Sequence, residues 1–558
     1  MSTETRIQEW LKGPYDEETK SEIRRLQKED PKALFNAFFK DLSFGTGGMR
    51  GIMGVGTNRM NLYTIRRATQ GLANYMKKQP FESLSAFIGY DVRHHSKEFA
   101  EEAASVLAGN GIRVFLTKNI CPTPLVSFGC RYFECQAAIM ITASHNPPAY
   151  NGYKVYWKDG AQVVPPHDVG IMEEVHRVSR VQLGELDPPL VHWVGEEIDH
   201  AYLQEMKKLQ LYPNLRGTLK IIYSPLHGTG IRLVPKALKD WGFKDVSLVE
   251  KQSAPDGNFT FAASPNPEEG EALRLGEEQL GKEKGDLLIA TDPDADRVGV
   301  VIGGKVRLTG NQMGCLLLHH ICHALTEKKE FPSNAAFVKT IVTTELFKKI
   351  AQYYGGTCID VLTGFKYIGE KIAEWEQSFG GYQYIFGAEE SYGCLFGTAV
   401  RDKDAVSASC LIAEAAALAK QENLTLLDRL HQLYKKYGVH RESLTNLAFS
   451  DSKAGMEEMQ TLMRKLREHP PTKIGEVPVV SVEDYLSGKM SLPLSDVLRF
   501  WLQDESKLVI RPSGTEPKIK IYAEVVGHAK REIEAEIASS DARLSGLVGA
   551  FRKECLLL

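Results

Sequence analysis

The chain has 558 residues, 43% of them hydrophobic and 25% charged, which is the composition of an ordinary soluble globular protein. It is too long for a single hydrophobic core, so we expect about three to five domains. Its formal net charge of -3 gives no electrostatic case for binding nucleic acid or an anionic membrane, although local donors can still bind small anions.

The nine cysteines follow neither a C-x-x-C pattern nor the spacing of a zinc site, which predicts reduced thiols. The first residues contain no apolar signal core. No run approaches the roughly 18 apolar residues that a membrane span needs. We therefore expect a cytoplasmic protein without a membrane segment.

Residues 1–42 alternate charged and apolar side chains at helical spacing, which predicts about two helices. A glycine-rich stretch follows at 44–51, and such loops let backbone N–H groups approach an anion. Its spacing fits neither the dinucleotide fingerprint nor the Walker pattern. A flexible surface loop is the alternative, but Arg50 favours phosphate because a guanidinium binds phosphate through two hydrogen bonds.

Strand and helix patterns then alternate, which predicts an α/β layer. We expect helices over 61–78 and 97–109, and strands over 85–90, 113–116, 137–141 and 153–157.

The stretch 142–154 carries a serine loop, Thr-Ala-Ser-His-Asn-Pro-Pro-Ala-Tyr-Asn-Gly-Tyr-Lys. Its prolines and glycine favour an ordered loop, which places Ser144 at a strand end with its hydroxyl held outward. His145, Asn146 and Lys154 supply donors around it. A plain turn is the alternative for this stretch alone, but a serine ringed by donors suits an oxygen that carries phosphate.

A polar, acidic segment over 180–200 marks a boundary near residue 200. A second α/β unit is expected beyond it, with strands over 220–223, 246–249 and 287–290, a helix over 232–240 and a long loop over 252–270.

The last of these strands runs into Asp292, Asp294 and Asp296, three carboxylates at alternate positions that can converge on one hard cation. An EF-hand is excluded, because its sixth and twelfth positions hold Arg297 and Gly303. A three-carboxylate site leaves ligand positions open and suits Mg²⁺ that also binds a phosphate oxygen. A solvated acidic turn is the alternative, but like charges this close repel without a cation. Arg297 is placed to hold a substrate or phosphoserine oxygen.

A third α/β unit is expected from about 308, with a helix to 325 and strands over 336–340 and 384–386. The loop 387–393 offers Glu389 and Ser391 to sugar hydroxyls, with a helix-capping turn as the alternative. Asp402 and Asp404 are interpreted as solvated charges. Helices are expected over 405–420 and 426–437, with Thr425 as the cap of the second.

The last unit begins near 440, with strands over 507–510 and 518–524 and a helix over 530–550. Between the two strands, a guanidinium, two hydroxyls and a free backbone N–H fall within five residues: Arg511, Ser513, Gly514 and Thr515. This arrangement fits a phosphate monoester, with a plain β-turn as the alternative.

Four motifs stand in order: Thr-Ala-Ser-His-Asn-Pro, Asp-Pro-Asp-Ala-Asp-Arg, Ala-Glu-Glu-Ser and Arg-Pro-Ser-Gly-Thr-Glu-Pro. With them the chain resembles the α-D-phosphohexomutase family along nearly its whole length. The resemblance implies four domains around a central cleft, at 1–200, 201–307, 308–438 and 439–558. The first three are expected to be similar α/β units with mixed sheets, and the fourth a TATA-binding-protein-like α+β domain.

The resemblance also implies roles for individual residues. Ser144 matches the family's phosphoserine, and the three aspartates match its Mg²⁺ ligands, with the serine phosphate completing the metal site. The positions that match charge-stabilising and proton-transfer residues are Arg50, His145, Lys154 and Arg297. The expected substrate-binding residues are Lys366, Glu389, Ser391, Arg511, Ser513, Gly514 and Thr515.

The sugar loop departs from the bacterial phosphomannomutase-like pattern, because Gly393 stands where those members often have histidine. The chain looks closer to the branch of α-phosphoglucomutases and phosphopentomutases. The implied activity is interconversion of glucose 1-phosphate and glucose 6-phosphate, with Mg²⁺ and a hexose 1,6-bisphosphate activator, in a monomer or dimer. Action on mannose or pentose phosphates stays open, as do two other classes: a metal-dependent sugar-phosphate phosphatase and a silent sugar-phosphate-binding regulator.

Overall fold

The computed structural model describes residues 2–42, 44–45, 48–215, 219–262, 264–304, 306–450, 452–513, 517–528 and 532–557. The chain divides into two compact units. Unit 1 comprises residues 1–310, 364–387 and 391–418, and unit 2 comprises 311–363, 388–390 and 419–558.

Unit 1 opens with three short helices, where the sequence predicted about two: α1 (Thr3–Lys12), α2 (Glu17–Glu29) and α3 (Pro31–Phe38). Each begins at a capping side chain, Ser2, Asp16 or Asp30, that accepts a hydrogen bond from a first-turn N–H. Their apolar faces meet around Trp10, Ile23 and Phe38 and form a small core of their own.

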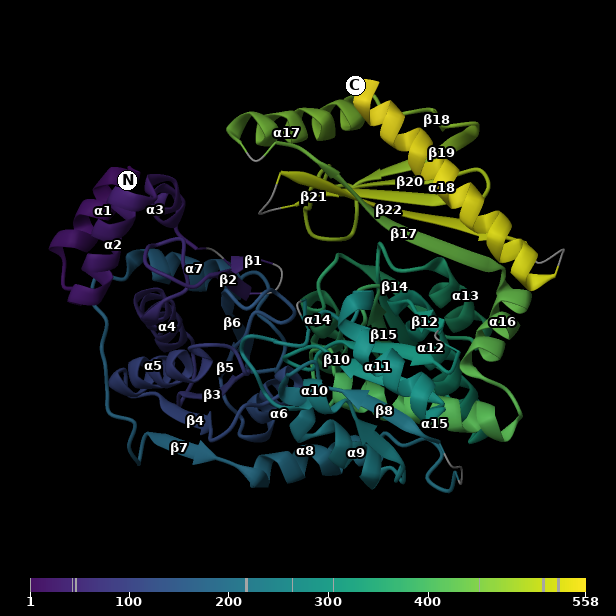
Figure 1. Ribbon diagram of the computed structural model, residues 1–558, viewed down its shortest axis with the longest axis horizontal. Helices are drawn as coiled ribbons and strands as arrows, with labels where there is room; N and C mark the ends of the chain where they lie inside the picture. The colour runs from purple at the N-terminus through teal and green to yellow at the C-terminus, as the bar shows by residue number, and fades with distance from the viewer. Residues whose placement is uncertain are drawn as a thin grey trace. The chain divides into compact units, whose positions relative to one another are not determined.

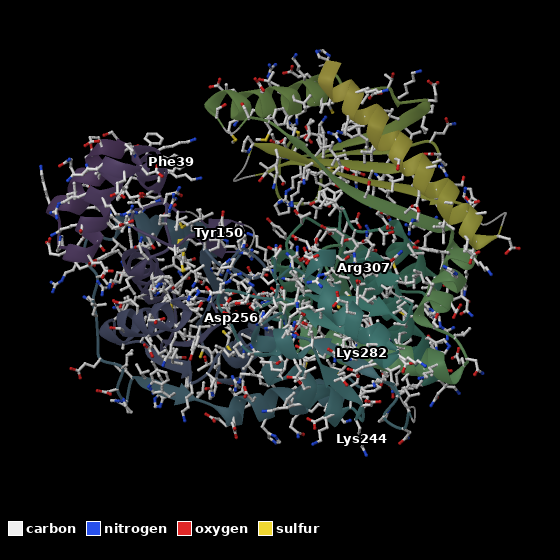
Figure 2. All side chains as sticks on the ribbon, in the orientation of Figure 1. Phe39, Tyr150, Lys244, Asp256, Lys282 and Arg307 are labelled. Atoms are coloured by element: carbon white, nitrogen blue, oxygen red, sulfur yellow. The ribbon has the colours of Figure 1, made fainter. Side chains whose placement is uncertain are left out.

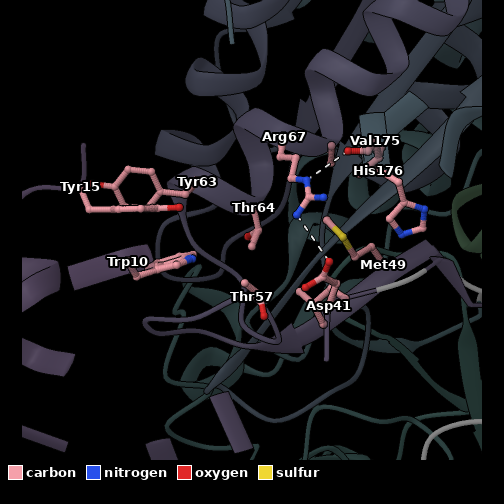
Figure 3. A pocket seen from close by; sticks show the side chains of 12 residues that line it. Trp10, Tyr15, Asp41, Met49, Thr57, Tyr63, Thr64, Arg67, Val175 and His176 are labelled. Carbon is pink, nitrogen blue, oxygen red and sulfur yellow. Dashed lines mark hydrogen bonds and ion pairs between the residues drawn. The ribbon is translucent and has the colours of Figure 1, made fainter. Parts of the chain in front are cut away.

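A pocket lies where these helices meet α4 (Leu62–Lys77) and β2 (Gly48–Ile52) (Figure 3). Trp10, Tyr15 and Tyr63 form its aromatic wall. The Arg67 guanidinium donates to the carbonyl of Val175 at 3.1 Å and approaches Asp41 Oδ2 at 3.5 Å, the two contacts drawn as dashed lines. The aromatic packing and the ion pair indicate that this pocket belongs to the contact between the N-terminal helices and the rest of the first domain.

The first sheet has seven strands in the order β1-β2-β6-β5-β3-β4-β7. Its strands are β1 (Phe44–Gly45), β2 (Gly48–Ile52), β3 (Ser85–Tyr90), β4 (Arg113–Thr117), β5 (Ala137–Ile141), β6 (Tyr150–Trp157) and β7 (Val191–Val194). The helices between them are α4 (Leu62–Lys77), α5 (Ser96–Gly109), α6 (Thr123–Tyr132) and α7 (His167–Arg177). Strands β3, β4, β5 and β7 are parallel, whereas β6 runs antiparallel to β5.

Strand β5 is the continuous apolar run of a strand covered on both faces, and all five of its residues are buried. Strand β3 lies between β4 and β5. Parallel strands present their carboxyl ends at one edge of a sheet, so the loops after β3 and β5 meet there. Figure 2 labels Tyr150, the first residue of β6, which closes the loop that begins after β5.

The second sheet has five strands in the order β12-β11-β10-β8-β9. Its strands are β8 (Ile221–Ser224), β9 (Val246–Leu248), β10 (Leu287–Thr291), β11 (Val298–Ile302) and β12 (Val306–Leu308). The accompanying helices are α8 (Glu196–Lys208), the 3₁₀ helix η1 (Thr229–Arg232), α9 (Val234–Asp240), α10 (Glu250–Ser253) and α11 (Gly270–Glu283). Strands β8 and β10 are parallel, and β10 turns back into antiparallel β11.

The third sheet has the order β14-β13-β15-β16, with β13 parallel to β14. Its strands are β13 (Ala335–Thr340), β14 (Thr357–Val361), β15 (Gln383–Glu389) and β16 (Gly393–Phe396). The helices of this region are α12 (Gly310–Glu327), α13 (Glu345–Tyr353), α14 (Lys366–Gln377), α15 (Ala405–Gln421) and α16 (Leu426–Tyr437). Thr425 caps α16 in a capping box with Asp428, which confirms the predicted helix start.

The fourth sheet is fully antiparallel, with six strands in the order β17-β22-β21-β20-β19-β18. Its strands are β17 (Val439–Ala448), β18 (Lys473–Ile474), β19 (Val477–Asp484), β20 (Leu498–Leu502), β21 (Lys507–Pro512) and β22 (Lys518–Gly527). Helices α17 (Lys453–Glu468) and α18 (Ile533–Leu557) lie on one side of it (Figure 1). Three mixed α/β sheets and a fourth antiparallel α+β sheet confirm the predicted fold class.

Within the part of the chain that the structure describes, every helix is too short or too polar to span a membrane.

Candidate active site

Ser144 stands three residues beyond β5, at the carboxyl edge of the first sheet. Its backbone is left-handed, with φ of 53°, a region that residues other than glycine seldom occupy. The Ser144 N–H donates to Thr142 Oγ1 at 2.8 Å, which helps to hold this conformation. A non-glycine residue kept in such a conformation is typical of a functional site.

The three aspartates stand on the tight connection from β10 to β11. Asp292 Oδ1 accepts hydrogen bonds from the backbone N–H groups of Asp296, at 3.1 Å, and Arg297, at 3.0 Å. These bonds curl the loop so that one oxygen of each aspartate lies within 4.8 Å of the others. All three side chains are buried.

The serine loop and the aspartate loop meet inside unit 1. Ser144 Oγ donates to Asp292 Oδ2 at 2.7 Å, although 148 positions separate the two residues in the sequence. Thr123, at the start of α6, donates to Asp294 Oδ2 at 2.7 Å through its hydroxyl and to the Asp294 carbonyl at 2.8 Å through its backbone N–H. The structure therefore brings the predicted serine and the predicted carboxylates together.

Two buried lysines face the carboxylates. Lys154 Nζ lies 2.8 Å from Asp294 Oδ2 and 3.0 Å from Asp296 Oδ2. Lys403 Nζ lies 3.2 Å from Asp296 Oδ2. Burial alone would lower the pKa of Lys154, but Asp294 and Asp296 outweigh it and raise that pKa, so the amine is a cation in this arrangement.

The aspartate carboxyl groups differ in the direction of their pKa shifts. Burial, together with Asp294 and Asp296, raises the pKa of Asp292 well above its usual value. Burial also acts to raise the pKa of Asp294, but Lys154 outweighs it and the pKa falls. Among the described residues, Asp294 Oδ1 and Asp296 Oδ1 are buried oxygens that accept no hydrogen bond. Such oxygens are costly to bury alone, and a hard divalent cation fits them.

His145 and Arg50 lie beside the serine. His145 Nδ1 is 3.2 Å from Ser144 Oγ, and Arg50 donates to Asn146 Oδ1 at 3.2 Å. Burial lowers the pKa of His145 well below its usual value, and Arg297 and Arg50 lower it further. The imidazole beside the hydroxyl is therefore neutral.

The other predicted residues divide between the two units. In unit 1, Arg297 pairs with Glu268 at 2.5 Å and Lys366 with Asp168 at 3.4 Å, while Ser391 lies in the turn between β15 and β16.

In unit 2, Glu389 is buried at the end of β15, the Arg511 guanidinium donates to Thr363 Oγ1, and the Ser513 N–H donates to the Lys518 carbonyl at 2.8 Å. Gly514 and Thr515 lie outside the described residues, as do Thr46 and Gly47 of the glycine-rich stretch.

The interpretation of Asp402 and Asp404 as solvated charges is wrong. Asp402 is buried and accepts hydrogen bonds from the Tyr156 hydroxyl, at 2.9 Å, and the Gln162 amide, at 2.7 Å. Asp404 is equally buried and accepts from the Tyr202 hydroxyl at 2.7 Å. Both carboxylates satisfy buried donors from distant parts of the chain, which a local reading of the sequence does not show.

Lys403 and Thr123 both contact the aspartate loop, but the sequence did not predict them as site residues. Lys403 stands in a charged run directly before the apolar helix α15, and nothing local marks it as buried, because charged residues are mostly exposed. Nothing in the local sequence distinguishes Thr123 from an ordinary helix-start threonine.

Four protein-family models together match nearly the whole chain. The four matching models are described as phosphoglucomutase/phosphomannomutase domains: alpha/beta/alpha domains I, II and III over residues 41–182, 200–305 and 309–437, and the C-terminal domain over 444–540.

Two curated relatives show the same likeness in sequence. The chain is 37% identical over 506 residues to a phosphoglucomutase of Staphylococcus haemolyticus, and 36% identical over 505 residues to one of Staphylococcus aureus. Each alignment covers 87% of this chain and 90% of the relative.

Among solved structures, the fold is similar to that of the Paramecium phosphoprotein pp63/parafusin, a phosphoglucomutase, with a TM-score of 0.70 at 17% identity over 92% of this chain and 96% of that one. It is also similar to that of a phosphoglucomutase/phosphomannomutase family protein from Burkholderia thailandensis, with a TM-score of 0.66 at 19% identity over 91% and 97%.

This fold and these relatives define an intramolecular phosphotransferase of the isomerase class, a phosphohexomutase. More particularly, the chain belongs to the phosphoglucomutase/phosphomannomutase family.

Proposed function

We propose that this phosphohexomutase interconverts glucose 1-phosphate and glucose 6-phosphate through a phosphorylated Ser144 and a bisphosphorylated sugar. The observation that carries the proposal is the 2.7 Å contact between Ser144 Oγ and Asp292 inside the buried aspartate cluster. The name of the staphylococcal relatives supports glucose as the sugar.

Asp292, Asp294 and Asp296 would hold Mg²⁺, and an oxygen of phosphorylated Ser144 would complete its ligands. The Oδ1 atoms of Asp294 and Asp296, which accept no hydrogen bond, support this assignment. When bound, the ion would offset negative charge on the transferring phosphoryl group. Arg50 and Arg297 would add positive charge around the same group.

Ser144 would carry the phosphoryl group that is transferred. In the forward direction, the bond between phosphorus and Ser144 Oγ breaks while a bond forms to the sugar 6-hydroxyl oxygen. The proton of that hydroxyl passes to a base, for which His145 is the candidate because it lies 3.2 Å from Ser144 Oγ, whereas Lys154 is already a cation. Lys154 would in turn supply a proton where an oxygen leaves phosphorus.

The bisphosphate would then turn over in the site. Its 1-phosphoryl group returns to Ser144 Oγ, which regenerates the phosphoenzyme and leaves glucose 6-phosphate. A hexose 1,6-bisphosphate would serve as activator because it can phosphorylate an empty Ser144.

Recognition of both orientations would need a sugar loop and a phosphate clamp. The residues proposed for these tasks are Lys366, Glu389 and Ser391 for the sugar, and Arg511, Ser513, Gly514 and Thr515 for the non-reacting phosphate.

A substrate panel tests the proposal. The 1-phosphates of glucose, mannose, glucosamine and ribose are compared with Mg²⁺ and a trace of the matching bisphosphate, and both isomer formation and free phosphate are measured. We expect glucose 1-phosphate to give the highest kcat/KM and free phosphate to stay at background. A preference for ribose or mannose would replace the proposed sugar, and steady phosphate release without an isomer would favour a phosphatase.

A further inference from the structure

Arg93 connects the loop after β3 to the serine loop. Its side chain is fully buried and donates to four backbone carbonyls of that loop: Ser144 at 2.6 Å, Asn146 at 2.5 Å, Pro147 at 2.9 Å and Tyr150 at 3.0 Å. A single side chain thus holds both ends and the middle of the turn that presents the serine.

Asp91 holds Arg93 in place. One carboxylate oxygen, Oδ2, lies 3.2 Å from Arg93 Nε. The other, Oδ1, accepts from the Arg93 backbone N–H at 2.9 Å and from the Ser96 hydroxyl at 2.7 Å. The ring of Phe259 lies 5.0 Å from the guanidinium, a cation–π contact that adds to the stabilisation of the buried charge. Ion pair and hydrogen bonds together offset the cost of burying the two charges.

A second path leads from Asp91 to the serine. Asp91 Oδ2 accepts from the Thr142 hydroxyl at 2.6 Å, and Thr142 Oγ1 accepts from the Ser144 N–H at 2.8 Å. The backbone of Ser144 is therefore fixed on its N–H side through Thr142 and on its carbonyl side through Arg93. These two restraints oppose relaxation of the left-handed φ at Ser144.

We propose that Arg93 is a positioning residue for the reaction: it fixes the backbone from 144 to 150 so that Ser144 Oγ stays directed at Asp292. It acts through the loop backbone and touches no substrate atom. The proposal rests on the proposed role of Ser144 as phosphoryl carrier. Displacing a reacting oxygen by about 1 Å can cost on the order of 100-fold in rate, so such a restraint has a measurable effect.

Arginine suits this task because its planar guanidinium presents five N–H donors in a fixed fork. Here Nη1 and Nη2 donate to the four carbonyls, and Nε lies 3.2 Å from Asp91 Oδ2 as an ion pair. A lysine keeps the charge but offers only three donors on one atom, so Arg93→Lys should retain the ion pair with Asp91 and lose most of the carbonyl contacts.

The test compares Arg93→Lys and Arg93→Ala with Leu72→Ala, a control in the core of the same domain on α4. Kinetics are measured below the melting temperature of every variant, with and without guanidinium chloride at millimolar concentration. We expect Arg93→Lys to lower kcat at least about 10-fold and to change KM by less than about twofold. Guanidinium should restore activity severalfold in Arg93→Ala and leave wild type and Leu72→Ala unchanged.

Hydrogen exchange of segment 142–151 provides a readout that does not depend on activity. We expect faster exchange in both Arg93 variants and no change in Leu72→Ala. Unchanged exchange, or a kcat of Arg93→Lys within twofold of wild type, would overturn the proposal, as would a loss of kcat that simply follows the loss of melting temperature in all three variants. If wild type itself forms no isomer while the Arg93 variants still exchange faster, Arg93 fixes the loop and the failure belongs to the proposed function.

Discussion

The charged residues 401–404 are all buried, so each needs a partner inside the protein. Asp402 contacts Tyr156, Gln162 and Lys403. Lys403 in turn contacts Asp296 of the aspartate cluster. Burial acts to raise the pKa of Asp402, but Lys403 and Lys154 outweigh it and lower that pKa, so this carboxyl is an anion. Its charge balances two buried amines beside the site.

We expect Asp402→Ala to lower the free energy of unfolding by about 3–5 kcal/mol, because it removes one counter-charge of buried Lys403 and leaves the Tyr156 and Gln162 donors without their acceptor. The exposed carboxylate of Asp187 provides a control, and Asp187→Ala should change stability by less than about 0.5 kcal/mol. Urea denaturation measures both variants. Equal, small effects would contradict a buried, charge-balancing Asp402.

The sequence predicted the serine and the carboxylates because each lies in a compact motif at a strand end. It did not predict Arg93 or Thr123, because the loop carbonyls that Arg93 binds and the aspartate that Thr123 binds stand 51 or more positions away in the chain. Contacts of this kind depend on which strands are neighbours, and a local pattern does not contain that information.

At the scale of elements, strongly periodic or fully apolar segments were predicted best. Strand β3 and helix α16 have the expected bounds, and β5 is the expected buried run. Three of the elements that were not predicted are β14, α6 and β17. Strand β14 is half-buried over most of its length, and α6 contains proline and glycine. In β17, buried and exposed residues do not alternate regularly. Short or half-exposed elements form because neighbours pair with them, and periodicity alone does not reveal this.

The capping box of α16 gives a prediction at this scale. Thr425 Oγ1 accepts from the Asp428 N–H at 3.1 Å, and Asp428 Oδ2 accepts from the Thr425 N–H at 2.8 Å. Thr425→Ala should cost about 1 kcal/mol at the helix start and speed amide exchange in the first turn of α16 about fivefold. Thr425→Ser, which keeps the hydroxyl, should exchange like wild type. Equal exchange in the alanine and serine variants would contradict a capping role.

At the scale of the whole molecule, unit 2 is held together by a buried ionic network. Lys507 lies 2.8 Å from Glu345 and 3.1 Å from Glu524, and Glu524 accepts from His440 Nδ1 at 2.7 Å. Lys339 lies 2.9 Å from Glu345 and extends the network into β13. The network thus ties the helix and strand of the third sheet to the antiparallel C-terminal sheet.

This network predicts acid sensitivity of unit 2. Burial acts to raise the pKa of Glu524, but Lys507 and His440 outweigh it and bring that pKa from 4.5 to about 2. A depressed pKa contributes stability that is fully present above about pH 4.5 and is lost as the pH falls towards 2. At about 1.4 kcal/mol for each pKa unit, Glu524 alone contributes about 3 kcal/mol to the free energy of unfolding.

Urea denaturation of wild type between pH 7 and pH 3 measures this loss. Lys507→Met removes the main cation, so it should be less stable at pH 7 and should lose less on acidification than wild type. An identical pH dependence in the two proteins would contradict the role of the network.

The proposed mechanism depends most on a phosphoryl group carried by Ser144 beside the aspartate cluster. The most direct measurement incubates the protein with Mg²⁺ and hexose 1,6-bisphosphate labelled with radioactive phosphate, maps the label by peptide mass spectrometry and then adds unlabelled glucose 1-phosphate. We predict that the label appears on Ser144, that glucose 1-phosphate discharges it into sugar phosphate, and that Ser144→Ala and Asp294→Asn take up none. Label on another residue, or label on Ser144 that sugar phosphate does not discharge, would contradict the account.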